Sequence, residues 1–248
     1  MGRRAALVAG GLLVAGAIGV AAVVVMRGSK TAQPPPAPTT PARPKPTIEH
    51  VSELAARVLP GKPVALRASP GGRILARVGS RTEFGSPQTL EVAFRKGDWI
   101  AVRSPALGNR QLGWVREKPL RLVGRTVRIE VDLSARTLTV VKRGVIYRRD
   151  AVAIGSPKTP TPTGDFYVTD KLPGARFGTY YGCCILALSG RQPNLPKGWS
   201  GGDRLAIHGT PVADFGKAVT NGCLHLPGEV LQFLMTDVPL GTPVRIHA

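Results

Sequence analysis

The stretch His208–Leu226, HGTPVADFGKAVTNGCLHL, decides how the rest of this chain is interpreted. His208 follows a short apolar run and precedes Gly209, and fifteen residues later Cys223 follows Gly222. A thiol that transfers an acyl group needs a nearby base and backbone N–H groups aimed at the developing oxyanion. Glycine beside the thiol lets a substrate carbonyl approach the backbone. A lone cysteine is usually a small buried apolar residue, so the pairing at this spacing carries the argument.

The stretch resembles the catalytic signature of the L,D-transpeptidases of the YkuD type. Asn221 departs from the family's commonest form, which has His there, and His225 stands where members often carry Arg or Asn. These departures concern how substrate is positioned and not the type of reaction. The matching residues are His208-Gly209-Thr210, Gly216-Lys217-Ala218-Val219, Thr220 and Gly222-Cys223-Leu224.

The resemblance implies that Cys223 attacks the carbonyl of an L-to-D peptide bond in a peptidoglycan tetrapeptide stem, with His208 as base. D-alanine leaves, and an amine of a neighbouring stem resolves the thioester to give a 3→3 cross-link. Pairing with His208 should favour the thiolate over the free thiol. We expect the N–H groups of Gly222 and Cys223 to form the oxyanion hole.

The same resemblance gives supporting roles to further residues and leaves two rival functions open. Thr220, Asn221 and Gly209 are expected to position the substrate or the loop, and no metal or cofactor is needed. A carboxypeptidase would resolve the thioester with water. A membrane-tethered protein that only binds the cell wall would keep the fold without the reaction.

Composition limits the class of protein. The 248 residues include 43% apolar residues, enough for a packed core, and carry a net charge of +19. The excess is spread evenly, at +6 over residues 1–47, +7 over 48–124 and +6 over 125–248. A nucleic-acid binder usually concentrates its charge, whereas an even excess suits a protein held near an anionic matrix or membrane. We therefore expect no nucleic acid, and stem peptides as partners of a monomer.

Three cysteines do not form a disulfide framework, because Cys183 and Cys184 are adjacent and only Cys223 is left. No pair has the spacing of zinc ligands. The simplest expectation is that Cys183 and Cys184 point to opposite faces of a packed strand. The alternative is a redox pairing that involves Cys223 and silences it.

The N-terminal region, residues 1–30, contains 22 consecutive uncharged residues at positions 5–26. As a helix this run spans roughly 33 Å, enough for a hydrocarbon core of about 30 Å. It exceeds the apolar core of a cleavable signal, so an uncleaved anchor is favoured over a cleaved signal and over a buried helix. The domains would then lie outside the cytoplasm, in the cell envelope.

Residues 31–47 are rich in proline and predict a polyproline II spacer that reaches about 45 Å at about 3.1 Å per residue. A ligand for a proline-binding module is the alternative. No core is expected in this segment.

Residues 48–124 read as short strands broken by turns, with strands expected at 62–68, 73–78, 99–103 and 112–116. This segment is similar to the bacterial Src-homology-3-like modules, a small antiparallel barrel, through its motifs around Trp99 and Trp114. The two tryptophans are expected to fill the core of the barrel, although a peptide- or glycan-binding groove is the alternative.

Residues 125–248 predict a β-rich catalytic domain. Strands are expected at 127–133, 137–141, 145–155, 165–168, 204–208 and 244–247, with a single helix at 227–235. Thr159-Pro-Thr-Pro-Thr-Gly164 matches a Thr-Pro-x-Gly loop of the family, either a substrate rim or a structural turn. Residues 171–203 should be irregular apart from a strand at 183–188, and Tyr180, Tyr181 and Trp199 are candidates for contacting substrate. The expected fold is mostly β, with a membrane helix, a small barrel and this catalytic domain.

Overall fold

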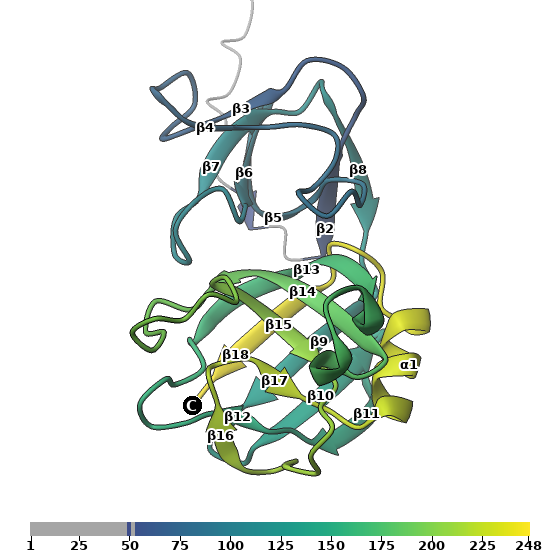
Figure 1. Cartoon of the computed structure of the whole chain (residues 1–248). Coiled ribbons are helices and arrows are strands. Elements are labelled where there is room, and N and C mark those ends of the chain that lie inside the picture. The colour runs from purple at the N-terminus through teal and green to yellow at the C-terminus, as the bar shows by residue number, and fades with distance from the viewer. Residues whose placement is uncertain (1–48, 51–52) are drawn as a thin grey trace, which may run out of the picture. The chain divides into compact units, whose positions relative to one another are not determined.

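Strands make up most of the described structure, a computed structural model that covers residues 49–50 and 53–248 (Figure 1). One short α-helix lies near the C-terminus, so the expectation of a mostly β fold is confirmed. The expected membrane segment 5–26 and the spacer 31–47 lie outside the described residues. Within residues 49–50 and 53–248, no helix has the length and apolar composition needed to cross a membrane.

The first sheet has the strand order β4-β3-β7-β6-β5-β2-β8, with β1 paired to β5, and its pairings are antiparallel. The four strands expected from alternation are present as β3, β4, β6 and β7, and the sequence pattern missed β2, β5 and β8. The similarity to Src-homology-3-like modules stays a prediction. The strands are β1 Glu49–His50, β2 Leu54–Val58, β3 Val64–Arg67, β4 Ile74–Val78, β5 Thr89–Lys96, β6 Trp99–Arg103, β7 Gly113–Arg116 and β8 Leu120–Gly124.

Trp99 and Trp114 are partly exposed, so the expectation that they fill the core of the first sheet is wrong. Aliphatic side chains such as Leu66, Leu90 and Ile100 fill it instead. Because side chains alternate along a strand, Trp99 and Trp114 lie on the opposite face from their neighbours Ile100 and Val115, which belong to the core. The Arg116 guanidinium covers the Trp99 ring at 4.6 Å from its centroid.

The second sheet has the order β11-β10-β9-β18-β13-β14-β15-β17. Its pairings are antiparallel except β9 with β18 and β15 with β17, and β12 pairs with β16 in a separate parallel ribbon. The strands are β9 Val127–Asp132, β10 Thr137–Lys142, β11 Val145–Ala151, β12 Ile154–Gly155, β13 Gly164–Pro173, β14 Cys184–Arg191, β15 Arg204–His208, β16 Ala218–Thr220, β17 Leu224–His225 and β18 Pro243–His247.

The helix α1, Gly228–Asp237, begins after Pro227, whose fixed φ suits the start of a helix. Val230, Leu231 and Leu234 form a buried stripe at helical spacing. They join the main core of the second sheet, and α1 packs against β14. The helix therefore lies where the apolar pattern of residues 227–235 predicted it.

The segment 171–203 is more regular than expected. The strand β13 continues to Pro173 and β14 to Arg191, so the two pair along much of their length. Between them lie two short 3₁₀ helices, η1 Gly174–Arg176 and η2 Thr179–Tyr181. Glycine and proline placed at the ends of these strands made the segment look irregular, although the strands themselves carry buried residues throughout.

The two sheets belong to one compact unit. Tyr167 of β13 is fully buried in the core of the first sheet, and Thr82 Oγ1 donates to Asp170 Oδ1 at 2.5 Å. The Arg103 guanidinium bridges Glu91 at 3.1 Å and Asp165 at 3.0 Å. Residues of the two sheets are thus joined by apolar, hydrogen-bonded and ionic contacts.

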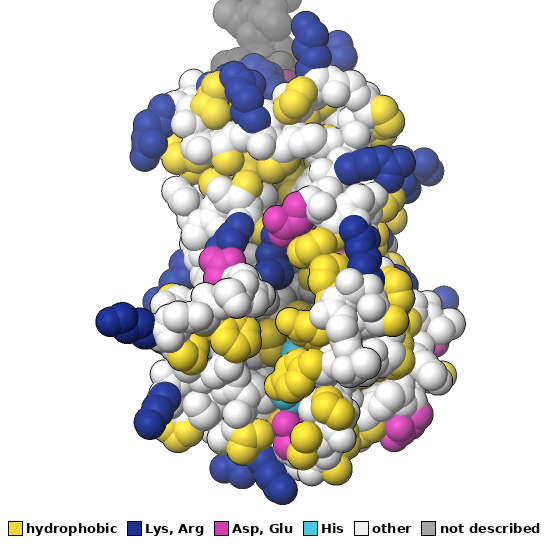
Figure 2. Space-filling view, in the orientation of Figure 1, with side chains coloured by type: hydrophobic (Ala, Val, Ile, Leu, Met, Phe, Trp, Pro, Cys, Tyr) yellow, Lys and Arg dark blue, Asp and Glu magenta, His cyan; other side chains and the backbone are white. Residues whose placement is uncertain are grey.

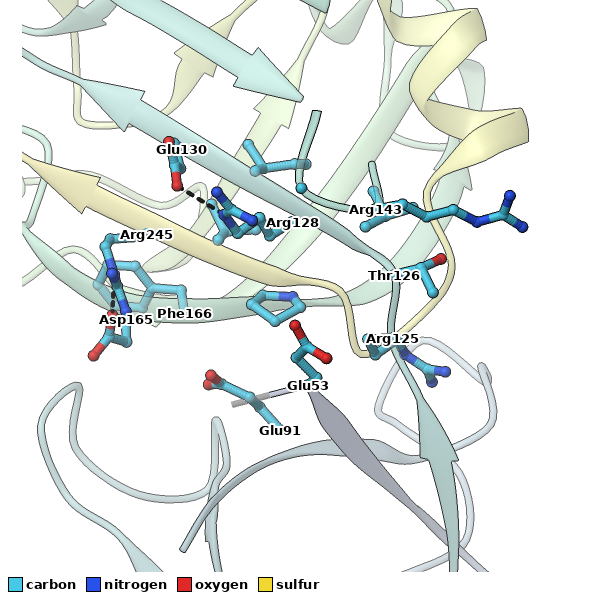
Figure 3. A pocket seen from close by; sticks show the side chains of 15 residues that line it. Glu53, Glu91, Arg125, Thr126, Arg128, Glu130, Arg143, Asp165, Phe166 and Arg245 are labelled. Carbon is cyan, nitrogen blue, oxygen red and sulfur yellow. Dashed lines mark hydrogen bonds and ion pairs between the residues drawn. The ribbon is translucent and has the colours of Figure 1, made fainter. Parts of the chain in front are cut away.

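A cavity of about 500 Å³ opens along β9 and β18 (Figure 3). Glu53 and Glu91 face it from the first sheet, and ion pairs join Arg128 to Glu130 and Arg245 to Asp165 at its wall. None of the residues that line it is a candidate site residue, so this cavity is separate from the site described next.

Candidate active site

His208 ends β15 beside β17, in a parallel pairing whose register sets Ile207 opposite Leu224 and His208 opposite His225. Ile207 and Leu224 are fully buried in the core. Because side chains alternate along a strand, His208, His225 and the residue before Leu224, Cys223, share the opposite face. The structure thus brings the two candidate catalytic residues to one face of two neighbouring strands.

The His208 ring is oriented by the backbone of the next residue, Gly209. Its Nδ1 lies 2.6 Å from the carbonyl oxygen of Gly209, and a carbonyl only accepts, so Nδ1 carries the proton and Nε2 is left as the basic atom. Burial, and after it the neighbouring His225, lower the pKa of His208 from 6.5 to about 4, against smaller raising effects of the Gly209 bond and Asp214. The base is therefore neutral at physiological pH.

Cys223 packs against the buried cluster of Leu172, Ile185 and Ala206. Its hydrogen bond among the described residues is to the Arg204 carbonyl oxygen, 4.0 Å away, at the opposite end of β15. Burial raises the pKa of the thiol to about 11, against a smaller lowering by a hydrogen bond from the Ala206 backbone. This raised pKa runs against the expectation that His208 stabilises a thiolate, because desolvation is its largest cause.

Thr220 closes the turn that carries the thiol. Its hydroxyl donates to the Cys223 carbonyl oxygen at 2.6 Å and accepts from the Gly222 N–H at 3.0 Å. The Gly222 N–H is therefore already hydrogen-bonded within the turn, contrary to the expectation that it belongs to an oxyanion hole. Asn221 is exposed at the tip of the same turn, and its side-chain oxygen accepts a weak 3.4 Å bond from Thr159.

Hydrogen bonds from the threonine-proline loop, residues 159–164, hold the turn that carries Cys223. Thr159 Oγ1 donates to the Thr220 carbonyl oxygen at 2.9 Å, and Thr161 Oγ1 donates to the Gly222 carbonyl oxygen at 2.9 Å. Both threonines are buried. Of the two readings left open by the sequence, the hydrogen bonds favour a structural role for this loop.

Gln192 is a residue of the site that the sequence did not reveal. Its Nε2 donates to the carbonyl oxygens of Pro160 and Asn221, at 2.9 and 3.1 Å, and so links the loop to the turn. It packs so closely on Gly222 that a Cβ there would lie 2.0 Å from Nε2, and Gly222 also has a φ of +110°. Only glycine fits, but the partner that demands it is 30 residues away in sequence.

Aromatic side chains cover the base. The Tyr181 ring lies 4.9 Å from the His208 ring, and the Tyr180 ring 6.0 Å from it. The Gly209 N–H donates to the Tyr181 carbonyl oxygen, so backbone also holds this cover in place. Histidine atoms are visible only in a hollow bordered by hydrophobic side chains (Figure 2). Trp199 is exposed and donates its indole N–H to Gly202 within its own loop.

Cys183 and Cys184 form a disulfide with each other, so the expectation of two separate thiols on opposite faces of a strand is wrong. Cys183 precedes β14 and is exposed, which frees its side chain to turn back on that of Cys184. Cys223 carries a free thiol, and the alternative of a redox pairing with it is not seen. Within residues 49–50 and 53–248, no group of three His, Cys, Asp or Glu side chains is arranged to hold a metal ion.

Comparisons with known proteins match the C-terminal part of the chain. Residues 126–246 match the YkuD family, described as the L,D-transpeptidase catalytic domain. YkuD of Bacillus subtilis is 34% identical over 122 residues, and YkuD of Bacillus licheniformis is 33% identical over 122 residues. Each match covers 48% of this chain, and the chain spans 65% and 64% of the lengths of these relatives.

Among solved structures, an L,D-transpeptidase from Mycobacterium smegmatis is similar at 23% identity and a TM-score of 0.40, covering 55% of this chain and 73% of that chain. The family match begins at the start of β9 and includes both Cys223 and His208. Residues 126–246 of this chain thus match the L,D-transpeptidase catalytic domain of the YkuD family, which is the family that the chain resembles.

Proposed function

We propose that the chain is a peptidoglycan L,D-transpeptidase that forms 3→3 cross-links through a thioester on Cys223. The observation that carries the proposal is the placement of His208 and Cys223 on one face of β15 and β17, with Nε2 of the imidazole left as the base. A neutral imidazole and a neutral thiol suit proton transfer during the attack, since neither has to lose a resting charge.

In the first half-reaction, the thiol turns from the Arg204 carbonyl toward His208 by rotation about Cα–Cβ. Such a rotamer change is fast compared with turnover. The sulfur attacks the carbonyl carbon of the L-to-D peptide bond while the thiol proton passes to Nε2 of His208. The C–N bond then breaks, the departing D-alanine amine takes that proton, and a thioester remains.

In the second half-reaction, an amine of a neighbouring stem attacks the thioester carbonyl. His208 takes a proton from this amine, the C–S bond breaks, and the sulfur regains a proton from the imidazolium. The new amide is the cross-link, and the enzyme returns to its neutral resting state.

The negative charge on the attacked carbonyl oxygen needs a donor. The Gly222 N–H is engaged by Thr220, so we assign the Cys223 N–H to the oxyanion. Gly222 contributes by its missing side chain, and Thr220 by holding the turn. Asn221 is exposed two residues before Cys223, and we assign it a contact with the substrate.

The proposed location is the cell envelope, with the uncharged segment 5–26 as a membrane anchor and the catalytic domain on the extracytoplasmic side. The proline-rich segment after it would act as a spacer toward the wall. A tethered enzyme with an even positive excess suits an anionic matrix.

Purified tetrapeptide muropeptides test the reaction. We expect D-alanine release matched by cross-linked dimer, and neither product from Cys223→Ala. D-alanine without dimer would show a carboxypeptidase instead. No D-alanine from the wild-type chain, together with retention on isolated wall, would show a binding protein without the reaction.

A further inference from the structure

We propose that Asp214 and His225 are a pair of positioning residues that set the protonation and the ring plane of His208. The inference rests on the proposed role of His208 as the base. His225 Nδ1 lies 2.9 Å from Asp214 Oδ2, and the side chains are only 3% and 14% exposed. The centroids of the His225 and His208 rings are 4.5 Å apart.

The fold holds His225 rigidly beside the base. Its backbone exchanges two hydrogen bonds with Ala153, at 3.0 and 3.1 Å, on the side away from β15. Leu224 and Leu226 on either side of it are fully buried in the core. With its backbone clamped and Nδ1 bound, the ring has one orientation, and the adjacent His208 ring must pack against it.

The Asp214 carboxylate has no hydrogen-bond or ion-pair partner besides His225 in the described part of the chain. Its second oxygen, Oδ1, is buried and makes no hydrogen bond there. The Asp214 carboxylate is therefore hydrogen-bonded to the imidazole of His225 and not to that of His208. An imidazolium at His225 would be paired with Asp214, whereas an imidazolium at His208 would face that positive charge without a carboxylate of its own.

The remaining titratable groups around the two rings do not alter this balance of charges. Tyr180 meets both rings with its own ring, at 6.0 and 6.1 Å, and Tyr181 meets His208. Burial raises the pKa of each of these tyrosines, so both are neutral. Burial likewise raises the pKa of the Cys223 thiol on the same face.

The pair therefore acts on the base in two opposed ways. Positive charge at His225 lowers the pKa of His208, and the Asp214 carboxylate raises it. Together they keep Nε2 free to accept a proton in mildly acidic solution. Asn at position 225 offers a polar variant that cannot become charged.

The test uses the full chain and two measurements at each pH, the NMR titration of the His208 ring and kcat/KM on muropeptides. His225→Asn removes the positive charge, so we expect the His208 titration and the acidic limb of kcat/KM to move together to higher pH, by about one unit. The double variant His225→Asn/Asp214→Asn also lacks the carboxylate. Its His208 titration and the acidic limb of its kcat/KM should both move back toward lower pH.

His247→Asn is the matched control, because His247 is an exposed histidine on β18 and should change neither measurement. A His208 midpoint that stays in place in His225→Asn overturns the inference. If His225→Asn does not fold, as judged by its thermal transition, His225→Gln takes its place with the same expectation. A midpoint that moves as expected in a chain without turnover supports the pair and rejects the proposed function.

Discussion

Thr161 Oγ1 donates a 2.9 Å hydrogen bond to the carbonyl oxygen of Gly222, the residue before the candidate nucleophile. The same hydroxyl accepts the Gly155 N–H at 2.8 Å. One buried side chain therefore links β12, the threonine-proline loop and the catalytic turn. The backbone beside Cys223 is therefore held in position by hydrogen bonds that do not involve the thiol itself.

Thr161→Val should destabilise the chain and slow turnover. The substitution removes the hydroxyl, leaves a buried carbonyl and a buried N–H without a partner, and costs about 1–3 kcal/mol. Urea denaturation and kcat/KM on muropeptides measure the two effects. Thr236→Val is the matched control, since Thr236 is exposed on α1, and a loss as large there would show that the buried bonds are not responsible.

Gly222→Ala should lower stability by about 1–3 kcal/mol through backbone strain, with a further loss from the clash with Gln192. Shortening the partner in Gly222→Ala/Gln192→Ala should recover the steric part and leave the strain of the positive φ. Thermal unfolding of the single and double variants separates these contributions. Gly228→Ala, where a Cβ meets nothing within 4 Å, should change the transition little.

Two buried groups should give the free energy of unfolding opposite pH dependences. The pKa of His208 falls from 6.5 to about 4 through burial, so the unfolded state binds more protons between these values. The contribution of His208 to the free energy of unfolding is therefore present above pH 6.5 and is lost as the pH falls toward 4. The loss is about 3 kcal/mol, since each unit of difference in pKa corresponds to about 1.4 kcal/mol.

Glu91 acts in the other direction, because burial raises its pKa from 4.5 to about 7 despite the Arg103 guanidinium. The folded state keeps the proton, so this stability is present below pH 4.5 and is lost as the pH rises toward 7. Urea denaturation of wild type and Glu91→Gln at several pH values tests it. The difference between them should change steadily from pH 4.5 to 7, and a constant difference would contradict the account.

Alkylation of Cys223 should be slow at neutral pH. Burial raises the pKa of the thiol to about 11. The rate of reaction with iodoacetamide should therefore increase only at a pH well above the ordinary pKa range of cysteine. His208→Ala should leave this profile unchanged, because the thiol rests on the Arg204 carbonyl. A plateau already reached at neutral pH, abolished in His208→Ala, would instead indicate a resting thiolate–imidazolium pair.

Local patterns predicted the framework of the site well. The run Arg204–His208 forms β15 as expected, because a short, continuously buried stretch ends at a glycine. The hairpin at Arg143-Gly144 also forms, with both residues at positive φ, as a tight turn between twisted strands requires. In each case the residues that decide the structure are neighbours in sequence.

The connections that refine the site could not be read from the sequence in this way. Asp214 reaches His225 from an exposed loop, and Gln192 reaches Gly222 across 30 residues, so only the assembled fold brings them together. The direction of the Cys223 thiol depends on its rotamer and its burial. The spacing of His208 and Cys223 did not reveal which hydrogen bonds the turn between them already makes.

The most direct test of the central claim is the intact mass of the chain after brief exposure to tetrapeptide muropeptide without a competing acceptor. The account predicts an added mass equal to the donor without its terminal D-alanine, located on Cys223 and absent from Cys223→Ala. Turnover of the wild-type chain with no such adduct under rapid acid quench, or an equal adduct on Cys223→Ala, would contradict it.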